Sequence, residues 1–195
     1  MDVDKAIQSR RSIKKYKSKS PNWRRIIEAI DTAKYAPMAG NIFSLQFILV
    51  DEHSKIQKIA KWAEQDFIAE AKYVVLFLTN SKKTVSSYGK IGETYCRQQA
   101  GAAIQNFLLK LEKAKLSTCW IGHFNERLIK QTLRIADEIK IEAIFPIGFA
   151  NEKPKKRPEP DLNPYLFFNT WKNKRMIPSN KIEGRAPEGF GLNYK

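Results

Sequence analysis

The longest helical stretch of the sequence limits the possible folds more than any other segment. Residues 92–115 predict a single helix, and its middle, AGAAIQNFLLKL, is apolar on nearly every side. A helix that is hydrophobic all round is buried rather than laid on a surface. We therefore expect this helix to lie at the centre of the domain or of an interface.

Short apolar runs with the length of buried strands alternate with the other predicted helices. Ser20 and Pro21 predict a helix start, as N-cap and first helical residue. Residues 81–91 are polar and predict a loop. This alternation favours an α/β or α+β sandwich. The predicted strands cover residues 47–50, 73–78, 117–121 and 143–149, and further helices are expected over 3–11, 56–63 and 126–134.

Length and composition predict one folded domain with an extension. The chain has 195 residues, of which 43% are hydrophobic, which suffices for a sizeable core. After Asn151 the sequence turns to Lys, Pro, Asn and isolated aromatic residues without periodicity. We expect a domain over residues 1–160 and a C-terminal extension over 161–195.

The sequence lacks the signatures of several classes of protein. No apolar run approaches the roughly 20 residues of a membrane span, and the N-terminus has no signal-peptide pattern, so we expect a cytoplasmic protein. Cys96 and Cys119 are far apart, and we expect both to be reduced, with no metal site. Neither a GxGxxG nor a GxxxxGK[ST] motif occurs.

The formal net charge of +15 admits two interpretations. One is a nucleic-acid partner, because a basic surface attracts polyanions. The other is an ordinary lysine-rich surface, which we favour because the lysines are spread along the whole chain. Either surface would attract small molecules that carry phosphate.

Two segments in the first fifth of the chain offer ligand-binding groups. The first is RRSIKKY at residues 10–16, where arginine forks and a serine hydroxyl suit phosphate oxygens. The second is APMAGN at residues 36–41, a loop whose Pro and Gly let the backbone approach a flat ligand. Asn41 at its end supplies both a donor and an acceptor.

Two later segments add backbone donors and cations. Residues 118–124, TCWIGHF, join a strand end to a helix, where free N–H groups bind electron-rich atoms. Residues 153–158, KPKKRP, could bind phosphate. His53 and His123 are expected to be structural or surface residues, and no nucleophile–base pair is evident. That absence suits an enzyme whose cofactor carries the chemistry.

Taken together, these segments resemble the nitroreductase family. The resemblance rests on the order and spacing of RRSIKKY, APMAGN, FILV, AGAAIQNFLLKLEKAKLSTCWIG and FPIGFANEKPKKRP, and it covers roughly residues 1–160. It implies an α+β fold with a mostly antiparallel sheet flanked by helices. It also implies a homodimer with FMN at the subunit interface and a C-terminal tail that wraps the partner.

The resemblance assigns roles to individual positions. The segment with Arg10, Arg11, Ser12 and Lys14 is similar to the one that holds the FMN phosphate and ribityl chain, and Lys155 and Arg157 match a later phosphate-binding pair. The remaining matches concern the flavin ring. They are the loop residues Pro37, Met38 and Asn41, and the backbone N–H groups of Ile121 and Gly122.

The activity implied is ping-pong hydride transfer from NADH or NADPH to nitroaromatic, quinone or related small-molecule acceptors. Where family members often read N-x-Q-P-W, this chain has Asn41-Ile42-Phe43-Ser44-Leu45, so one flavin contact is absent and the cavity wall differs. Two alternatives stay open. One is a flavin-binding protein of the same fold that acts in dehalogenation, flavin breakdown or flavin storage. The other is a basic nucleic-acid-binding protein.

Overall fold

The structure is a computed structural model that describes residues 2–155 and 158–174. Its contacts divide the chain into two compact units, residues 1–154 and 155–195. The first unit contains all the regular helices and strands of the described residues. Within the described residues, no helix is both long and apolar enough to span a membrane.

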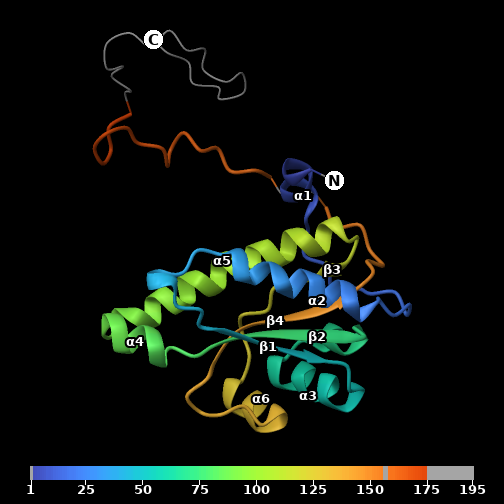
Figure 1. Cartoon of the computed structure of the whole chain (residues 1–195). Coiled ribbons are helices and arrows are strands. Elements are labelled where there is room, and N and C mark those ends of the chain that lie inside the picture. Colours follow the sequence, from blue (N-terminus) through green and yellow to red (C-terminus); the bar gives the residue numbers. More distant parts are fainter. Residues whose placement is uncertain (1, 156–157, 175–195) are drawn as a thin grey trace. The chain divides into compact units, whose positions relative to one another are not determined.

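The first unit is built on a four-stranded antiparallel sheet (Figure 1). Its strands are β1 (Leu45–Val50), β2 (Tyr73–Thr79), β3 (Ser117–Thr118) and β4 (Lys140–Gly148), in the order β1-β2-β4-β3. The four predicted strands are present, although β3 ends three residues early. With helices on both faces, this confirms the α+β fold with an antiparallel sheet.

One face of the sheet carries an aromatic core beneath α5 (Ile91–Lys113) and α2 (Trp23–Asp31). Phe77 of β2 lies against Phe107 of α5 and Phe145 of β4, with ring centroids 5.0 and 5.4 Å apart. Such tilted and edge-on pairs are favourable aromatic geometries. Helix α5 also contacts α1, α4 and three strands, so its predicted central position is confirmed.

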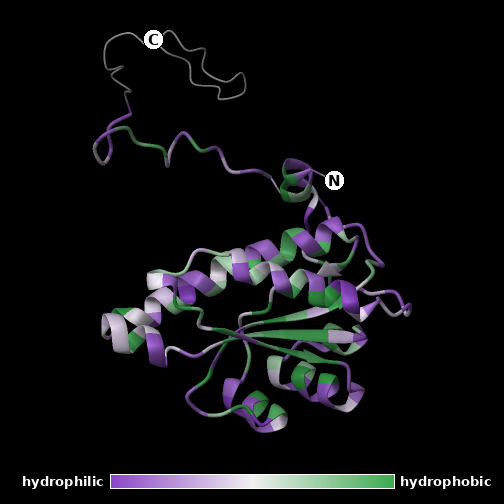
Figure 2. Ribbon diagram, in the orientation of Figure 1, coloured by the Kyte–Doolittle hydropathy of each residue, from purple (hydrophilic) through white to green (hydrophobic). Residues whose placement is uncertain are grey.

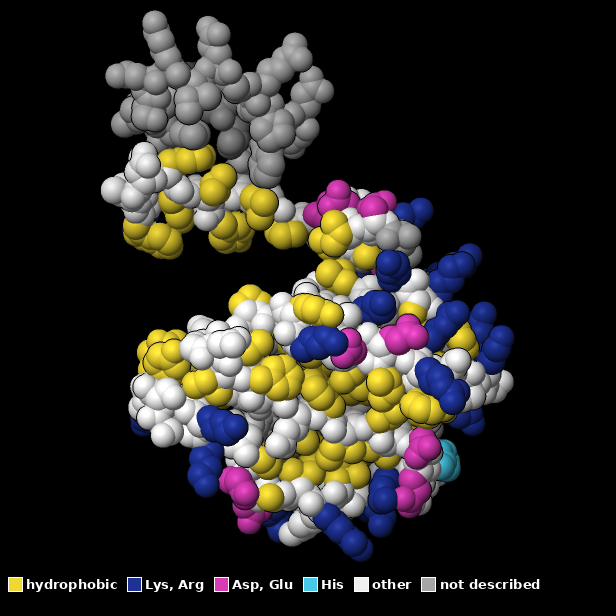
Figure 3. All heavy atoms as spheres, in the orientation of Figure 1, with side chains coloured by type: hydrophobic (Ala, Val, Ile, Leu, Met, Phe, Trp, Pro, Cys, Tyr) yellow, Lys and Arg dark blue, Asp and Glu magenta, His cyan; other side chains and the backbone are white. Residues whose placement is uncertain are grey.

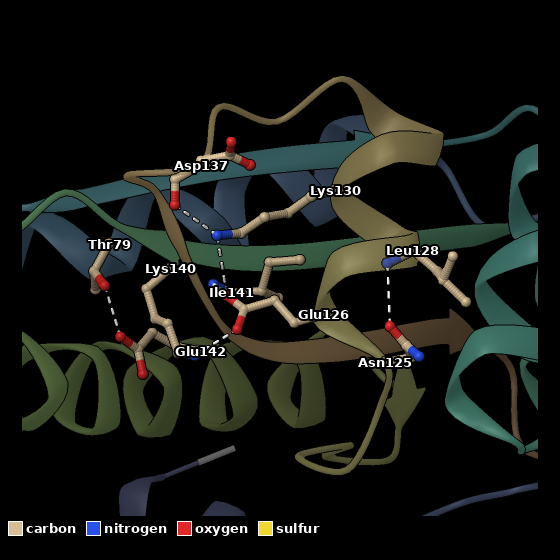
Figure 4. Close-up of polar contacts among 9 residues, drawn as sticks. All are labelled: Thr79, Asn125, Glu126, Leu128, Lys130, Asp137, Lys140, Ile141 and Glu142. Atoms are coloured by element: carbon tan, nitrogen blue, oxygen red, sulfur yellow. Dashed lines mark hydrogen bonds and ion pairs between the residues drawn. The ribbon is translucent and has the colours of Figure 1, made fainter.

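The opposite face is covered by α3 (His53–Ala63), η3 (Asp66–Glu70) and α6 (Glu126–Leu133). Its fully buried side chains are aliphatic, and the hydrophobic strands run between the two helical layers (Figure 2). Glu126 holds α6 to β4, because its carboxylate accepts the Ile141 N–H at 2.9 Å and pairs with Lys130 and Lys140 (Figure 4).

The N-terminal segment runs from α1 (Val3–Ser9) along the β3 edge of the sheet. Tyr16 anchors it, since its buried hydroxyl donates to the carbonyl oxygens of Ile13 at 2.7 Å and Pro146 at 3.2 Å. Burial raises the pKa of the Tyr16 phenol. A Cβ at Gly148 would lie 2.8 Å from the Tyr16 ring, so only glycine leaves room for this anchor.

Residues 82–88 form helix α4 (Lys82–Tyr88), so the prediction of a loop over 81–91 was wrong. Its sequence, KKTVSSY, lacks an apolar stripe, and α4 instead packs end-on against the start of α5. Gly92 permits that contact, because a Cβ there would lie 2.6 Å from the Thr84 backbone. Two 3-10 turns, η1 (Thr32–Tyr35) and η2 (Ala39–Asn41), precede β1.

The ends of four helices depart from simple expectation. Asn22, rather than Ser20, caps α2 by accepting the Arg24 N–H at 3.0 Å, and Pro21 stays outside the helix. Three residues with left-handed backbone conformation follow helices. They are Glu64 (φ 53°) after α3, Lys115 (φ 57°) after α5 and Arg134 (φ 55°) after α6. Glycine is the usual residue at such positions.

Candidate functional site

The first predicted segment lies at the β3 edge, held by its backbone. Ser12 forms a parallel bridge with Thr118, and the Ile13 N–H donates to the Thr118 carbonyl at 3.0 Å. The Lys14 and Lys15 N–H groups donate to the Glu152 carboxylate at 2.5 and 3.1 Å. This pairing leaves side chains, rather than backbone donors, to meet a ligand here.

The side chains of this segment differ in how much they are already engaged. The Arg11 guanidinium donates to the carbonyl oxygens of Gln8 at 2.6 Å and Arg10 at 2.8 Å. The Lys14 ammonium lies 5.3 Å from the Phe67 ring centroid. By contrast, the Arg10 guanidinium and the exposed Ser12 hydroxyl form no hydrogen bond with any described residue. Arg10 and Ser12 are therefore the side chains most ready to bind an anion.

The third predicted segment lies beside the first, because β3 continues into it. Ile121 is buried, and its N–H donates to the Ile144 carbonyl at 3.0 Å, so this donor is already used. Gly122 is exposed, and its N–H bonds to no described residue. A Cβ at Gly122 would meet only the Trp120 indole nitrogen, at 3.9 Å. Of the two backbone N–H groups predicted to bind a ligand at this turn, only that of Gly122 is available.

Thr118 is the first residue of the third segment and bridges to Ser12 of the first, but no role was predicted for it from the sequence. It is 7% exposed, and its hydroxyl has no hydrogen-bond partner among the described residues. A buried polar group without a partner is costly, so it indicates a ligand or water at that position. The residue is inconspicuous in the sequence, because a threonine at a strand end is ordinary.

The second predicted segment has a backbone shape that few residues adopt. Gly40 and Asn41 both have φ of 56°, and such left-handed pairs are rare outside Gly and Asn. Pro37 and Asn41 are exposed and Met38 is half-buried. The Asn41 side chain bonds to no described residue, so its amide is presented to solvent.

Helix α5 separates this second segment from the other two. Gly40 lies against Tyr88, just before α5 begins, whereas Ser9 donates to Glu112 at 2.7 Å near the end of α5. Gln99 of α5 contacts the Ile42 carbonyl oxygen, next to Asn41, and the stretch of α5 from Gln99 to Glu112 spans about 20 Å. Within one chain, therefore, Asn41 and Arg10 lie toward opposite ends of α5.

The fourth predicted segment falls outside the first unit. Lys155 begins the second unit, and Arg157 lies outside the described residues. The phosphate-binding role of this pair stays a prediction.

Large hydrophobic side chains are exposed on the α5 side of the first unit. Trp23 and Ile27 of α2 are 45% and 42% exposed, and Trp120 is 45% exposed. The face shown in Figure 3 also has hydrophobic side chains gathered across its middle. Exposed apolar groups of this size and number commonly mark interaction surfaces.

Known proteins resemble the first unit in sequence and fold. A family model described as "Nitroreductase family" matches residues 7–65 and 51–149, which together span well over half of the chain. A predicted NADH dehydrogenase/NAD(P)H nitroreductase of Methanothermobacter thermautotrophicus is 27% identical over 161 residues. The alignment covers 80% of this chain and 82% of that protein.

Solved structures extend the comparison to the fold. A nitroreductase family protein of Clostridium novyi NT is 26% identical with a TM-score of 0.72, and the match covers 89% of this chain and 96% of that one. An FMN-dependent nitroreductase of Clostridium difficile R20291 is 21% identical with a TM-score of 0.72, over 85% of this chain and 98% of that one.

Proposed function

Because the chain belongs to the nitroreductase family, we propose that it is an FMN-dependent oxidoreductase. It would draw electrons from NADH or NADPH and reduce nitroaromatic, quinone or related acceptors by a ping-pong sequence. The names of the M. thermautotrophicus relative and the C. difficile structure support the donor and the cofactor, respectively.

The residues at the β3 edge fit the cofactor. The buried Thr118 hydroxyl without a described partner lies next to Ser12, and Arg10 has a free guanidinium nearby in sequence. Together they offer charge and hydroxyl donors to a phosphate and a polyol chain. Lys155 and Arg157 are proposed to complete the phosphate site.

Gly122 and Asn41 would hold the flavin ring. The Gly122 N–H donor, which bonds to no described residue, would stabilise the electron-rich reduced ring, as a fixed dipole does in an oxyanion hole. Asn41 would pair with the ring edge that carries adjacent donor and acceptor groups, and Pro37 and Met38 would border it. When bound, FMN supplies the redox chemistry by accepting a hydride and returning the electrons.

The distance along α5 carries the proposal that the active unit is a homodimer. Arg10 and Asn41 of one chain lie about 20 Å apart along α5, yet both are assigned to one flavin site. A second copy resolves this conflict if it supplies Asn41 to the Arg10 site of the first. The exposed Trp23 and Ile27 offer apolar surface for such an interface.

We further propose that residues 1–160 form the cofactor-binding domain and that the extension over 161–195 wraps the partner. In the described part of the extension, Leu162, Tyr165 and Trp171 are exposed, at 56%, 72% and 77%. Side chains of this size are seldom left in water when a partner surface can cover them.

Mixing two variants with weakened FMN binding tests the shared site. Arg10→Ala and Asn41→Ala homodimers would each carry two defective sites, whereas a mixed dimer would carry one intact site and one doubly defective site. We expect subunit exchange to restore up to half of the wild-type FMN binding per mixed dimer. The control is a mixture of the double variant Arg10→Ala/Asn41→Ala with wild-type protein. If mixing restores nothing, Arg10 and Asn41 do not share a site across subunits.

Stopped-flow reduction of the yellow holoprotein by NADH and by NADPH, without acceptor, tests the reductase activity. Rapid bleaching with at least one donor is expected. If neither donor bleaches the bound flavin, the chain is a flavin protein with another activity, and the altered sequence after Asn41 would favour that alternative. A purified protein that binds no FMN would refute both.

A further inference from the structure

A buried polar cluster surrounds the segment that follows Asn41. It consists of Ser44, Thr84, Cys96 and Gln99, each less than 5% exposed, drawn from the loop before β1, from α4 and from α5. Polar groups this deeply buried are kept only where they satisfy one another. The site described above uses none of them.

Gln99 binds the loop backbone through its amide. Its Oε1 accepts the Ser44 N–H at 3.1 Å, and its Nε2 points to the Ile42 carbonyl oxygen at 3.5 Å. One side-chain amide thus contacts the backbone of both Ile42 and Ser44, two residues apart, as a neighbouring strand would. Gln99 is the polar interruption of a face of α5 that is otherwise lined by Ala100, Ala103 and Phe107.

Ser44 is fixed from its other sides as well. Its hydroxyl lies 2.8 Å from the Thr84 hydroxyl, to which the Cys96 thiol donates at 3.3 Å. Its carbonyl accepts the Asn80 N–H at 2.9 Å. The end of the loop is therefore tied to α4, α5 and the end of β2 at once.

The bonds to Ser44 matter because two residues shortly before it, Gly40 and Asn41, have an uncommon backbone conformation. Gly40 and Asn41 both occupy the left-handed region, and such conformations persist where the surroundings enforce them. The bonds on the N-terminal side of Asn41 are local, such as Ile42 N–H to Ala39 carbonyl at 3.0 Å. The connection to the protein core comes from the Gln99 cluster.

We propose that Gln99 is a positioning residue for Asn41, holding the loop so that the Asn41 amide is aimed at the flavin ring. This inference rests on the proposed function, in which Asn41 contacts the ring. It predicts that removing the Gln99 amide has the same effect on bound FMN as removing the Asn41 amide itself.

The test compares Gln99→Leu, Asn41→Ala and the double variant. Losing one neutral hydrogen bond to the ring should weaken FMN binding by about 2- to 13-fold. We expect both single variants to fall in this range, to shift the midpoint potential of bound FMN in the same direction, and to show no further change when combined. Ile129→Ala, a cavity in the opposite face, serves as the control for lost stability and should leave both quantities unchanged.

A readout without cofactor separates this inference from the function. In the FMN-free protein, Gln99→Leu should speed amide hydrogen exchange across residues 38–44, whereas Ile129→Ala and Asn41→Ala should not. Should Gln99→Leu fail to fold, Thr84→Val loosens the same cluster and should show the same pattern more weakly. Unchanged exchange, unchanged FMN affinity, or effects that multiply in the double variant would overturn the role of Gln99. If the wild-type protein does not bind FMN, the proposed function is wrong, and so is the role of Gln99 in directing Asn41 toward the flavin ring.

Discussion

The two faces of the sheet bury different kinds of hydrophobic side chain. The α5 face buries aromatic rings and leaves Trp23, Ile27 and Trp120 partly in water. The α3–α6 face buries aliphatic side chains, and neither helix has a strongly exposed large hydrophobic among the described residues. The α3–α6 face, the self-contained face, is covered by its own chain, whereas the α5 face leaves large hydrophobic side chains exposed. Stability and association can therefore be disturbed separately.

The largest expected effect is on the self-contained face. Ile129 of α6 is fully buried, and Ile129→Ala should lower the free energy of unfolding by about 2–5 kcal/mol because it leaves a cavity. Denaturant titration of FMN-free protein measures this. FMN affinity and dimerisation should survive wherever the variant is folded. A loss of FMN binding in folded Ile129→Ala would show that the two faces are not independent.

The next effect is on the ligand-binding edge. Gly122→Pro removes the N–H donor and restricts the turn, so the rate of flavin reduction should fall by about 100-fold or more. His123→Ala and Cys119→Ser should keep most of the activity, since neither side chain is needed to donate a proton. Stopped-flow reduction compares the three variants. Equal losses in Gly122→Pro and His123→Ala would point to damage of the whole loop instead.

A smaller effect is expected from Arg10, the proposed phosphate-binding cation. Arg10→Ala should weaken FMN binding by about 10- to 150-fold, the value of one charged hydrogen bond. Arg157→Ala should behave alike if it joins the same site. Lys17→Ala is the matched control, because Lys17 is an exposed cation just after the same segment, and its backbone N–H donates to the Phe149 carbonyl. Equal FMN affinity in Arg10→Ala and wild type would remove Arg10 from the site.

The smallest effect concerns the charge cluster of the self-contained face. Partial burial raises the pKa of Glu126, but hydrogen bonds from Lys140 and Ile141 outweigh it, so the net pKa lies below the usual value. A carboxylate with a lowered pKa stabilises the fold above its unfolded-state pKa, and this contribution is lost as the pH falls. Glu126→Gln should therefore cost about 1 kcal/mol or less at pH 7 and progressively less as the pH falls below the usual range of a carboxyl group. A cost that does not shrink as the pH falls would assign the effect to packing.

Sequence reasoning succeeded where burial alone decides the structure. The apolar runs of β1, β2 and β4 and the helix α5 were predicted from hydrophobicity, because each is buried on most sides. It failed at α4, whose polar sequence is helical because Gly92 lets it pack against α5. That contact depends on residues in another element and leaves no local pattern.

The candidate site was predictable in its parts but not in its arrangement. Arg10, Ser12 and Asn41 were singled out by residue type and by family resemblance, yet their separation along α5 appears only once the chain is folded. Ile121 was assigned a free N–H that the bridge to Ile144 uses. Gln99 could have been noticed as a polar residue within an apolar helix face, whereas the buried Thr118 hydroxyl gives no signal in the sequence.

The left-handed residues Glu64, Lys115 and Arg134 have a consequence for how this protein can change. Each holds a side chain in a backbone shape that costs about 1 kcal/mol relative to glycine. All three lie at or just after helix ends. Natural variation or engineering could therefore raise the heat tolerance of this enzyme through glycine at these positions, and later tolerate destabilising changes around the flavin that alter its choice of electron acceptor.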